Sequence, residues 1–222
     1  MEQIIKIISI KHLTHDVLEI KAEKPKDLEY VSGQAADISI NKPGLEKELR
    51  AFTFTSLPED DYIEFVIKTY PNHNGVTNAL LSLKTGDELI FHGIFGDIAY
   101  KGAGLFIAGG AGITPFLSII RNLEKTKRTN EAKLLFANKS KGDIIHEEYF
   151  KNLLGSNFIN VLSDEKIDGY EHGFVSQELI QKHNDGLSGY FYLCGPPPMM
   201  NAVEKHLASL GISEDKIVKE GF

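Results

Sequence analysis

A glycine-rich loop in the second half of the chain has the residue types that bind phosphate. An apolar run at residues 105–108 leads into the sequence GGAGITP at residues 109–115, and apolar side chains then recur at helical spacing. This order predicts a strand, a loop and a helix amino terminus, where backbone N–H groups attract an anion. We expect Thr114 to cap the helix and Pro115 to stand in its first turn. The residues expected to bind a pyrophosphate are Gly110, Gly112, Thr114 and Pro115.

A glycine loop alone is also typical of a tight turn without a ligand, but a second loop favours ligand binding. Residues 194–198 follow the apolar run 190–193 and precede another amphipathic helix. Both loops are therefore expected at the carboxyl edge of one parallel sheet, where doubly wound folds bind ligands. Cys194, Gly195 and Pro196 should line the pocket there. The alternative for Cys194 is a small buried apolar side chain, as free cysteines usually are.

The first half of the chain contains a second group of anion-binding residue types. Residues 50–56 read RAFTFTS, a strand pattern that combines a cation, aromatic rings and hydroxyl groups. A flavin nucleotide needs such groups, although an ordinary amphipathic strand has the same pattern. The sequence GVTN at residues 75–78 then opens a helix with free amides. The residues expected to bind a flavin nucleotide here are Arg50, Phe52, Thr53, Phe54, Ile67, Lys68, Gly75, Val76 and Thr77.

The hydrophobic pattern changes near residue 100, which predicts two domains. Before it, short runs alternate apolar and polar side chains, as in half-buried strands. After it, apolar runs alternate with helical segments, which indicates a parallel sheet with crossover helices. We predict a six-stranded antiparallel Greek-key β-barrel with one helix at residues 1–100 and a doubly wound α/β domain with a five-stranded parallel sheet at residues 101–222. The expected barrel strands are 4–10, 18–22, 36–40, 50–55, 63–67 and 88–92, the helix is 76–83, and the parallel strands are 105–108, 134–137, 158–162, 190–194 and 217–218.

Composition argues against several classes of protein. The formal net charge of −7 disfavours nucleic acid or an anionic membrane as a partner. A single cysteine provides neither an intrachain disulfide nor an iron–sulfur cluster. The eight histidines form no two-histidine helix motif, so we expect no metal site. Residues 102–120 carry no charge, but five glycines and Pro115 among them argue against a membrane span.

Together these motifs resemble the ferredoxin-NADP reductase family, over essentially the whole chain and in the same order. That family has an arginine, any residue, a tyrosine, then serine or threonine; this sequence has Arg50-Ala51-Phe52-Thr53. Phenylalanine keeps ring stacking but loses a phenolic hydrogen bond. The resemblance implies Arg50 on the flavin phosphate, Phe52 and Thr53 at the isoalloxazine ring, Gly75, Val76 and Thr77 on phosphate or pyrophosphate, residues 109–115 on the nicotinamide dinucleotide pyrophosphate, and Cys194, Gly195 and Pro196 on the nicotinamide side.

The ending Glu220-Gly221-Phe222 is similar to the family's terminal acid and aromatic residue. The resemblance implies that Phe222 covers the flavin until nicotinamide displaces it, and that Glu220 helps to relay protons. A frayed tail is the alternative, because chain ends are often disordered. The expected catalytic residues are therefore Thr53, Cys194, Glu220 and Phe222.

Charge near the third parallel strand bears on the choice of nicotinamide. NADP-preferring members of the family carry an arginine beside a serine, whereas this chain has Ser163-Asp164-Glu165. Asp164 can accept a hydrogen bond from the adenosine ribose 2′-OH and repels a 2′-phosphate, so NADH is preferred over NADPH. Lys166 works against this preference, and a solvated loop carboxylate is the alternative interpretation.

The resemblance implies a flavoprotein reductase that passes a hydride from NADH, or NADPH, to bound FAD and then electrons to a separate acceptor such as ferredoxin or flavodoxin. FAD is expected rather than FMN because two anion sites are present. The alternatives are a docking subunit of a larger complex and a sensing protein that holds flavin or dinucleotide without turnover. The first residues lack the basic start and apolar run of an export signal, which predicts a cytoplasmic location.

Overall fold

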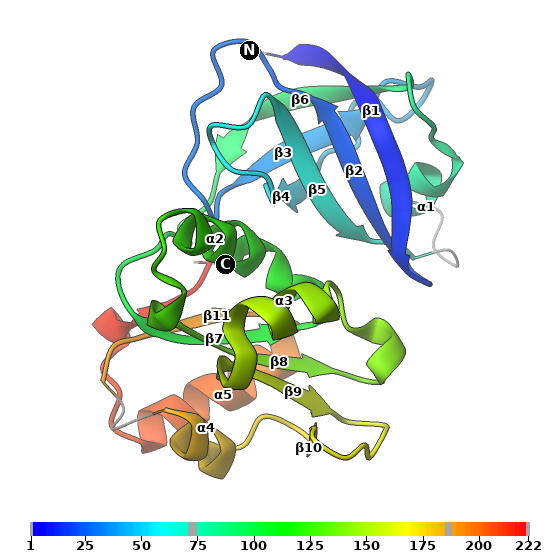
Figure 1. Ribbon diagram of the computed structural model, residues 1–222. Coiled ribbons are helices and arrows are strands. Elements are labelled where there is room, and N and C mark those ends of the chain that lie inside the picture. Colours follow the sequence, from blue (N-terminus) through cyan, green and yellow to red (C-terminus); the bar gives the residue numbers. More distant parts are fainter. Residues whose placement is uncertain (1, 71–74, 185–187, 221–222) are drawn as a thin grey trace.

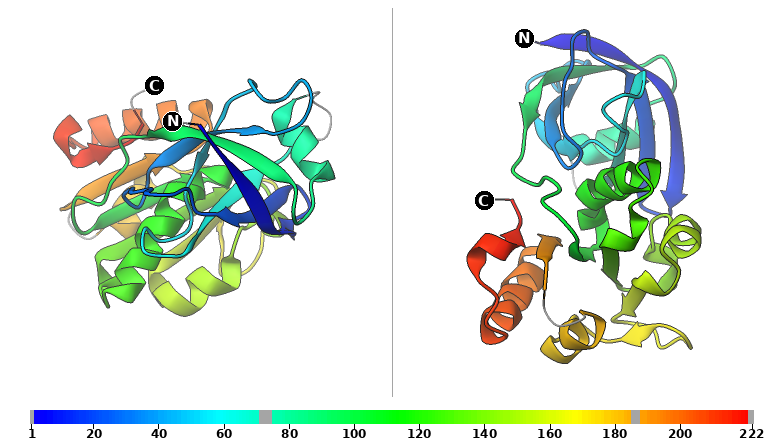
Figure 2. Two further views of the ribbon diagram at one scale, coloured as in Figure 1. Left: turned by 90° about the horizontal axis from the view of Figure 1, so that it is seen from above. Right: turned by 60° about the vertical axis from the view of Figure 1, so that its left-hand side comes forward.

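The computed structural model describes residues 2–70, 75–184 and 188–220. Two sheets, each of six strands, form two halves that lie one above the other in Figure 1, with helix α2 (Thr114–Lys125) between them. The first sheet is drawn from residues 3–95 and the second from residues 104–218. A second view shows the single segment that joins them, beside the described end of the chain (Figure 2).

The first half is the six-stranded antiparallel barrel predicted from the sequence. Its strand order is β4-β3-β6-β1-β2-β5, and an antiparallel bridge between Phe54 and Phe65 joins the two edge strands β4 and β5. The predicted helix is shorter than expected, since α1 (Val76–Ala79) passes into a 3₁₀ turn, η1 (Leu80–Ser82). The strands are β1 (Gln3–Thr14), β2 (Val17–Glu23), β3 (Ala35–Ile40), β4 (Arg50–Thr53), β5 (Tyr62–Lys68) and β6 (Glu88–Phe95).

The second half is a parallel sheet with helices on both faces. Its strand order is β10-β9-β8-β7-β11-β12, with six strands where the sequence predicted five. The additional strand, β10 (Glu171–His172), has two polar residues and pairs with β9, so no apolar run marks it. The other strands are β7 (Gly104–Gly109), β8 (Ala132–Asn138), β9 (Phe158–Leu162), β11 (Tyr190–Cys194) and β12 (Ile217–Val218).

Alternate residues of the central strand β7 face two separate cores. Phe106 packs with Phe116 of α2 and with helix α3 (Glu147–Leu154), whereas Ile107 packs with helices α4 (Gln177–His183) and α5 (Pro197–Ser209). This period of two is the strand repeat expected when both faces are covered. The doubly wound arrangement predicted from the sequence is thereby confirmed.

The uncharged stretch at residues 102–120 contributes β7, the 3₁₀ turn η2 (Gly110–Ile113) and the first half of α2. None of the helices in the described residues combines the length and the hydropathy that crossing a membrane requires. The stretch is therefore divided into a strand, a turn and a helix, as its glycines and Pro115 predicted.

Gly104 tests the close packing of β7 against β11. A Cβ built at Gly104 would lie 2.8 Å from the Tyr190 carbonyl carbon and 3.0 Å from its nitrogen. We expect Gly104→Ala to lower the free energy of unfolding by about 3 kcal/mol, because backbone cannot yield as a side chain can. Gly142→Ala is the matched control, since its nearest neighbour is Ser140 Oγ at 3.8 Å. Equal urea midpoints for the two variants would contradict this account of the packing.

Candidate active site

Two loops at the carboxyl edge of the parallel sheet pack directly against each other. A Cβ built at Gly112 would lie 2.5 Å from the Cys194 carbonyl carbon, and one at Gly109 would lie 2.5 Å from Met199 Sδ. Gly112 is thus required by contact with the backbone of the turn that follows β11, whereas Gly109 lies against the Met199 side chain of helix α5. Gly110 differs, because its φ is +52° and a Cβ there would meet no atom within 4 Å. The loop therefore has an open side at Gly110, where a ligand could approach the backbone.

Helix α2 begins immediately after this loop. The prediction that Thr114 caps the helix is wrong: Ile113 is the N-cap, and Thr114 is already helical, with its Oγ1 donating to the Ala111 carbonyl at 3.1 Å. The turn η2 brings the chain into helical geometry one residue earlier than the sequence indicated. Pro115 stands in the first turn as predicted, where its missing N–H costs no hydrogen bond. The Thr114 amide is already engaged, because it donates to the Ala111 carbonyl of η2. An anion would therefore approach the backbone at the open side of Gly110.

The flavin strand predicted from the sequence lies at the edge of the barrel. Thr53 pairs with Ala35 of β3, and Ala35 in turn pairs with Phe95 at the end of β6. The Arg50 guanidinium is exposed and donates to the Leu49 carbonyl at 2.6 Å. Its other described contact is an ion pair of 3.7 Å with the exposed Glu48, so it has capacity to bind a phosphate.

Three residues predicted to bind the flavin have their side chains in the barrel core. The Phe54 ring is fully buried and stacks on Tyr30 with centroids 4.1 Å apart. Ile67 and Val76 are 4% and 2% exposed in the same core. Their side chains therefore do not reach a cofactor, and only their backbone groups could contact one. The sequence did not reveal this because inward and outward positions of an isolated strand look alike.

Four other predicted residues keep accessible groups. Phe52 is half-buried against the core, with its ring 6.1 Å from that of Phe65. Lys68 forms an ion pair of 2.7 Å with Asp16, which competes with any phosphate for its charge. Gly75 precedes α1 in extended conformation, with no atom within 4 Å of a Cβ built there. Gly75 and Thr77 thus lie at a surface that can be approached by a ligand.

Glu220 connects the two halves at the predicted catalytic centre. Its carboxylate accepts a hydrogen bond of 3.1 Å from the Asp97 amide, in the segment that joins the sheets. A Cβ built at Gly96 would lie 3.1 Å from Glu220 Oε1 and 3.5 Å from the Ala35 nitrogen, beside the partner of Thr53. Phe222, the fourth predicted catalytic residue, lies outside the described residues.

Cys194 is held as a neutral thiol at this centre. Burial, and next the negative charge of Glu220, raise the pKa of the Cys194 thiol to about 12. A neutral thiol offers shape and polarisability but is a poor nucleophile. The structure brings Cys194 and Glu220 together, and Glu220 in turn next to the strand partner of Thr53.

Asp164 lies on the exposed loop after β9. Its Oδ1 accepts from Ser163 Oγ at 2.6 Å, and its amide donates to the Lys139 carbonyl at 2.9 Å. Next to this loop, the side chain of Asn138 at the end of β8 is 9% exposed, and neither of its polar atoms has a hydrogen-bond partner among the described residues. Buried polar groups without partners are rare, so this edge of the sheet has the character of a polar ligand site.

Phe174 is a residue that the sequence analysis missed. It is 84% exposed, and Gly173 beside it donates to the Leu162 carbonyl, next to the loop that carries Asp164. From sequence alone, an aromatic residue just before an amphipathic helix is expected in the core. Its exposure in the structure shows that the ring is available to stack on a base.

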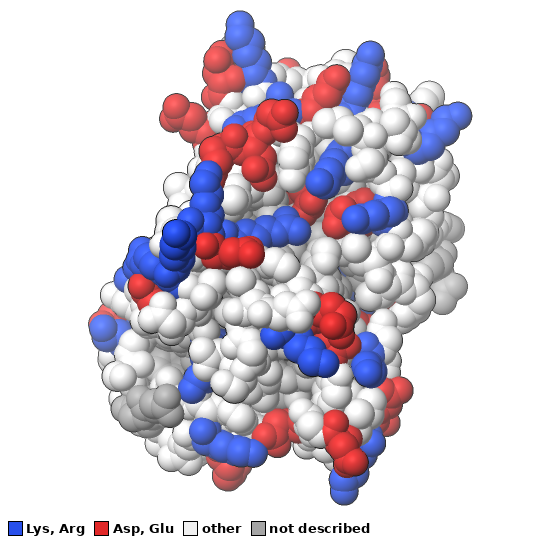
Figure 3. All heavy atoms as spheres, viewed as in Figure 1, with Lys and Arg blue, Asp and Glu red and all other residues white. Residues whose placement is uncertain are grey.

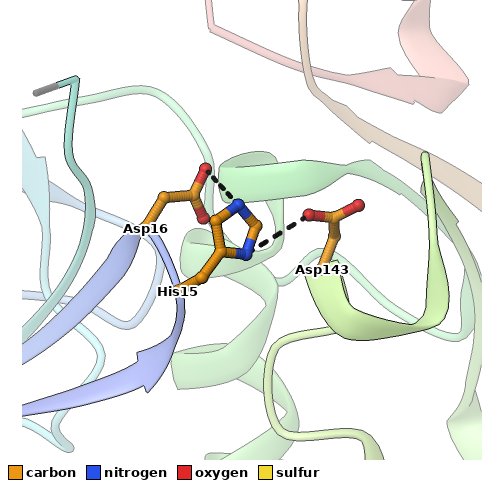
Figure 4. A group of neighbouring side chains, drawn as sticks. All are labelled: His15, Asp16 and Asp143. Atoms are coloured by element: carbon orange, nitrogen blue, oxygen red, sulfur yellow. Dashed lines mark ion pairs between the residues drawn. The ribbon is translucent and has the colours of Figure 1, made fainter. Parts of the chain in front are cut away.

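His15, Asp16 and Asp143 form the group in the described residues with ligand atoms close enough to hold a metal ion (Figure 4). Their carboxylates are already engaged, because Asp16 pairs with Lys68 at 2.7 Å and Asp143 accepts from Ser140 Oγ at 2.7 Å. His15 lies 3.7 Å from Asp16 and 3.9 Å from Asp143. We therefore describe the group as a polar contact between the halves and assign no metal to it.

Charged side chains of both signs are interspersed on the face shown in Figure 3. Neither sign forms a continuous field over that face, which fits the modest net charge of −7. Steering of a strongly charged partner is not indicated there.

The structure joins an antiparallel barrel, with the exposed Arg50 on its edge strand, to a parallel sheet with a glycine-rich loop. This combination is typical of two-domain, nucleotide-dependent flavoproteins. The family model for an FAD-binding domain matches residues 2–135, and that for an oxidoreductase NAD-binding domain matches residues 106–205. NADH-cytochrome b5 reductase 1 of Aspergillus terreus is 30% identical, over 94% of this chain and 77% of that protein. The chain belongs to the ferredoxin reductase-like flavoprotein family, with FAD and a nicotinamide nucleotide as its cofactors.

Other relatives are longer. The reductase component of propane 2-monooxygenase from Mycolicibacterium goodii is 30% identical over 97% of this chain but only 66% of its own length. The reductase component of the naphthalene 1,2-dioxygenase system of Pseudomonas putida is 26% identical, with 67% of its length covered. The chain thus spans about two thirds of the length of these curated relatives.

Solved structures share the whole fold. A ferredoxin NADP⁺ reductase from Neisseria gonorrhoeae with bound FAD and NADP superposes with a TM-score of 0.86 at 19% identity, covering 100% of this chain and 99% of that one. The FAD/NAD-binding domain of nitric oxide dioxygenase from Vibrio cholerae gives 0.87 at 21% identity, covering 97% and 96%. At these identities the likeness shows the fold alone.

The raised pKa of Cys194 predicts slow alkylation. With a pKa of about 12, the thiolate fraction at pH 8 is about 10⁻⁴, against about one quarter for a free cysteine. We expect iodoacetamide to react at least about 100-fold more slowly with the native protein than with the protein in urea. Glu220→Gln should raise the native rate, because it removes a negative charge.

Glu204→Gln is the matched control for that variant, because the Glu204 carboxylate pairs with Lys219 instead. Mass spectrometry of the alkylated protein measures all four rates. Native alkylation as fast as that in urea would contradict the assignment of a neutral, buried thiol.

Proposed function

We propose that the protein is a reductase that passes a hydride from NADH to FAD and then delivers electrons to a separate acceptor. The observation that carries this proposal is the packing of the glycine loop against the turn at Cys194, beside Glu220 and the edge of the flavin strand. When bound, FAD supplies the chemistry that the side chains lack, because it accepts a hydride and releases electrons singly or in pairs.

In this proposal the barrel, residues 1–100, holds FAD. Arg50 binds its phosphate, and Phe52 and Thr53 contact the isoalloxazine ring. The amides at Gly75, Val76 and Thr77 bind phosphate or pyrophosphate. This assignment is supported by the exposed guanidinium of Arg50 and by the open space around Gly75.

Residues 101–222 hold the dinucleotide in the same proposal. Its pyrophosphate lies at Gly110, Gly112, Thr114 and Pro115, and its nicotinamide at Cys194, Gly195 and Pro196. Asp164 accepts a hydrogen bond from the adenosine ribose, and Phe174 stacks on the adenine. The open side of the loop at Gly110 and the exposure of Phe174 support these positions.

Thr53, Cys194 and Glu220 surround the point of transfer. Cys194 stays neutral and provides a polarisable wall, so that no nucleophilic thiolate lies next to the electron-poor rings of the cofactors. Glu220 holds a carboxylate at the joining segment, where it can accept or return a proton. Phe222 is proposed to cover the flavin from the end of the chain.

The acceptor is proposed to be a one-electron protein carrier such as ferredoxin or flavodoxin. Support comes from the names of relatives that serve as reductase components of oxygenase systems. A cytoplasmic location is proposed with it. A sensing or docking role without turnover is the competing function, and it predicts bound flavin that NADH does not bleach.

An anaerobic absorbance titration distinguishes these functions. We expect NADH in substoichiometric amounts to bleach the flavin band of the purified protein, with NADPH much slower, because Asp164 repels a 2′-phosphate. Bleaching by neither nucleotide would reject the reductase function in favour of sensing or docking. Faster bleaching by NADPH would keep the reductase and reject the role of Asp164.

The carboxylate of Asp164 predicts a change of nucleotide preference on mutation. We expect Asp164→Ala to raise kcat/KM for NADPH relative to NADH by about tenfold, which corresponds to about 1.4 kcal/mol. Asp168→Ala is the matched control, since it removes another exposed carboxylate four residues further along the same loop. Steady-state kinetics with both nucleotides measure the ratio, and an equal change in both variants would contradict the prediction.

A further inference from the structure

Helix α2 is tied to the barrel by two side chains from one of its faces. Ser118 Oγ donates to the Ser56 carbonyl at 3.0 Å, and Arg121 Nη1 donates to the Thr55 carbonyl at 2.7 Å. Ser118 and Arg121 are three residues apart and so share a helix face. Figure 1 shows α2 against the barrel, where these contacts form.

A buried carboxylate completes the contact. Glu64 of β5 is 2% exposed, and its Oε1 lies 2.6 Å from Arg121 Nη1 and 2.8 Å from Thr55 Oγ1. Burial alone would raise the pKa of Glu64, but Arg121, Thr55 and Lys21 outweigh it and leave the pKa below its usual value. Both partners are therefore charged at neutral pH. Loss of Arg121 would leave the buried Glu64 carboxylate with only its longer ion pair, at 3.6 Å to Lys21.

The position of this contact links the two proposed cofactor sites. Thr55 and Ser56 lie two and three residues after Thr53 of the flavin strand. Arg121 lies about two helical turns from Thr114 of the proposed pyrophosphate site. A short rigid path thus connects the flavin strand to the dinucleotide loop. Neither Arg121 nor Glu64 touches the open side of that loop.

We propose that Arg121 is a positioning residue for hydride transfer. Through Glu64 and the carbonyl of Thr55 it fixes the amino terminus of α2 relative to Thr53. The proposal rests on the proposed function. Hydride transfer depends steeply on the separation of donor and acceptor, so a displacement of about 1 Å lowers the rate by about 100-fold. Loss of Arg121 should accordingly slow the transfer while dinucleotide binding is retained.

The test compares the FAD-loaded protein with Arg121→Gln and Arg121→Lys. Single-turnover absorbance at saturating NADH gives the rate constant for flavin reduction, calorimetry gives Kd for NAD⁺, and hydrogen exchange reports on residues 54–56. We expect Arg121→Gln to lower the rate constant by about 10- to 100-fold, to raise exchange at residues 54–56, and to change Kd by less than about threefold. Arg121→Lys should recover part of the rate, because it keeps the charge but not the planar fork.

Lys125→Gln is the matched control. Lys125 lies one turn further along α2 and pairs across the same interface with Glu59, but both side chains are about half exposed. Exposed pairs contribute little, so the rate constant of this variant should match that of the unmodified protein. If Arg121→Gln does not fold, Ser118→Ala carries the test, with an expected loss of about threefold in rate and raised exchange at residue 56.

Two results would overturn the proposal. One is an unchanged reduction rate in Arg121→Gln although exchange at residues 54–56 has risen. The other is a loss of NAD⁺ affinity or FAD content as large as the loss of rate, which would assign Arg121 to binding or folding. If neither NADH nor NADPH reduces the flavin of the unmodified protein, the proposed function itself fails. Separately, unchanged exchange at residues 54–56 in Arg121→Gln would show that Arg121 does not hold this segment of the barrel, and would reject the proposal.

Discussion

A carboxylate buried in the wall of the barrel has to be paired, and the nearer of its two cations comes from the other half of the molecule. Glu64 meets Arg121 at 2.6 Å, with Thr55 and Ser56 supplying further hydrogen bonds around them. Replacing such a pair by apolar residues often costs no stability, whereas removing one partner is severe. We infer that the pair contributes orientation more than net stability. The barrel and the parallel sheet are held in one arrangement because the shorter ion pair of Glu64, 2.6 Å to Arg121 against 3.6 Å to Lys21, crosses between them.

The same arrangement places a second set of groups at the joining segment. Gly96 has a φ of +112°, which disfavours any side chain, and a Cβ built there would lie 3.1 Å from the Glu220 carboxylate. Cys194 is half-buried near the negative charge of Glu220, and its thiol remains protonated. A neutral thiol next to a carboxylate suits hydride transfer between two cofactors, because neither side chain then reacts with the cofactor rings. Geometry and electrostatics at this edge thus agree with the proposed hydride transfer.

Much of this could be predicted from sequence, because period-two alternation and glycine punctuation are local signals. Strands with apolar runs were found, whereas β10 was missed because Glu171 and His172 carry no such signal. The cap predicted at Thr114 was wrong, and the burial of the Phe54 and Val76 side chains was not foreseen. Local patterns show neither where a helix begins nor which face of an element is inward. The roles of Arg121 and Phe174 could not be predicted from local sequence. Arg121 pairs with Glu64, which is far away in the chain, and the exposure of Phe174 depends on how the surrounding elements pack. The resemblance to a family supplied site residues but not the contact that connects the two halves.

The central claim is that hydride passes from the nicotinamide held by one half to the flavin held by the other. Its most direct test is single-turnover flavin reduction by NADH deuterated stereospecifically at C4, compared with unlabelled NADH. The account predicts a primary isotope effect on the flavin absorbance change for one of the two C4 positions and none for the other, because the site presents only one face of the nicotinamide. A protein that retains FAD and binds NADH, yet shows no absorbance change with either form, would contradict it.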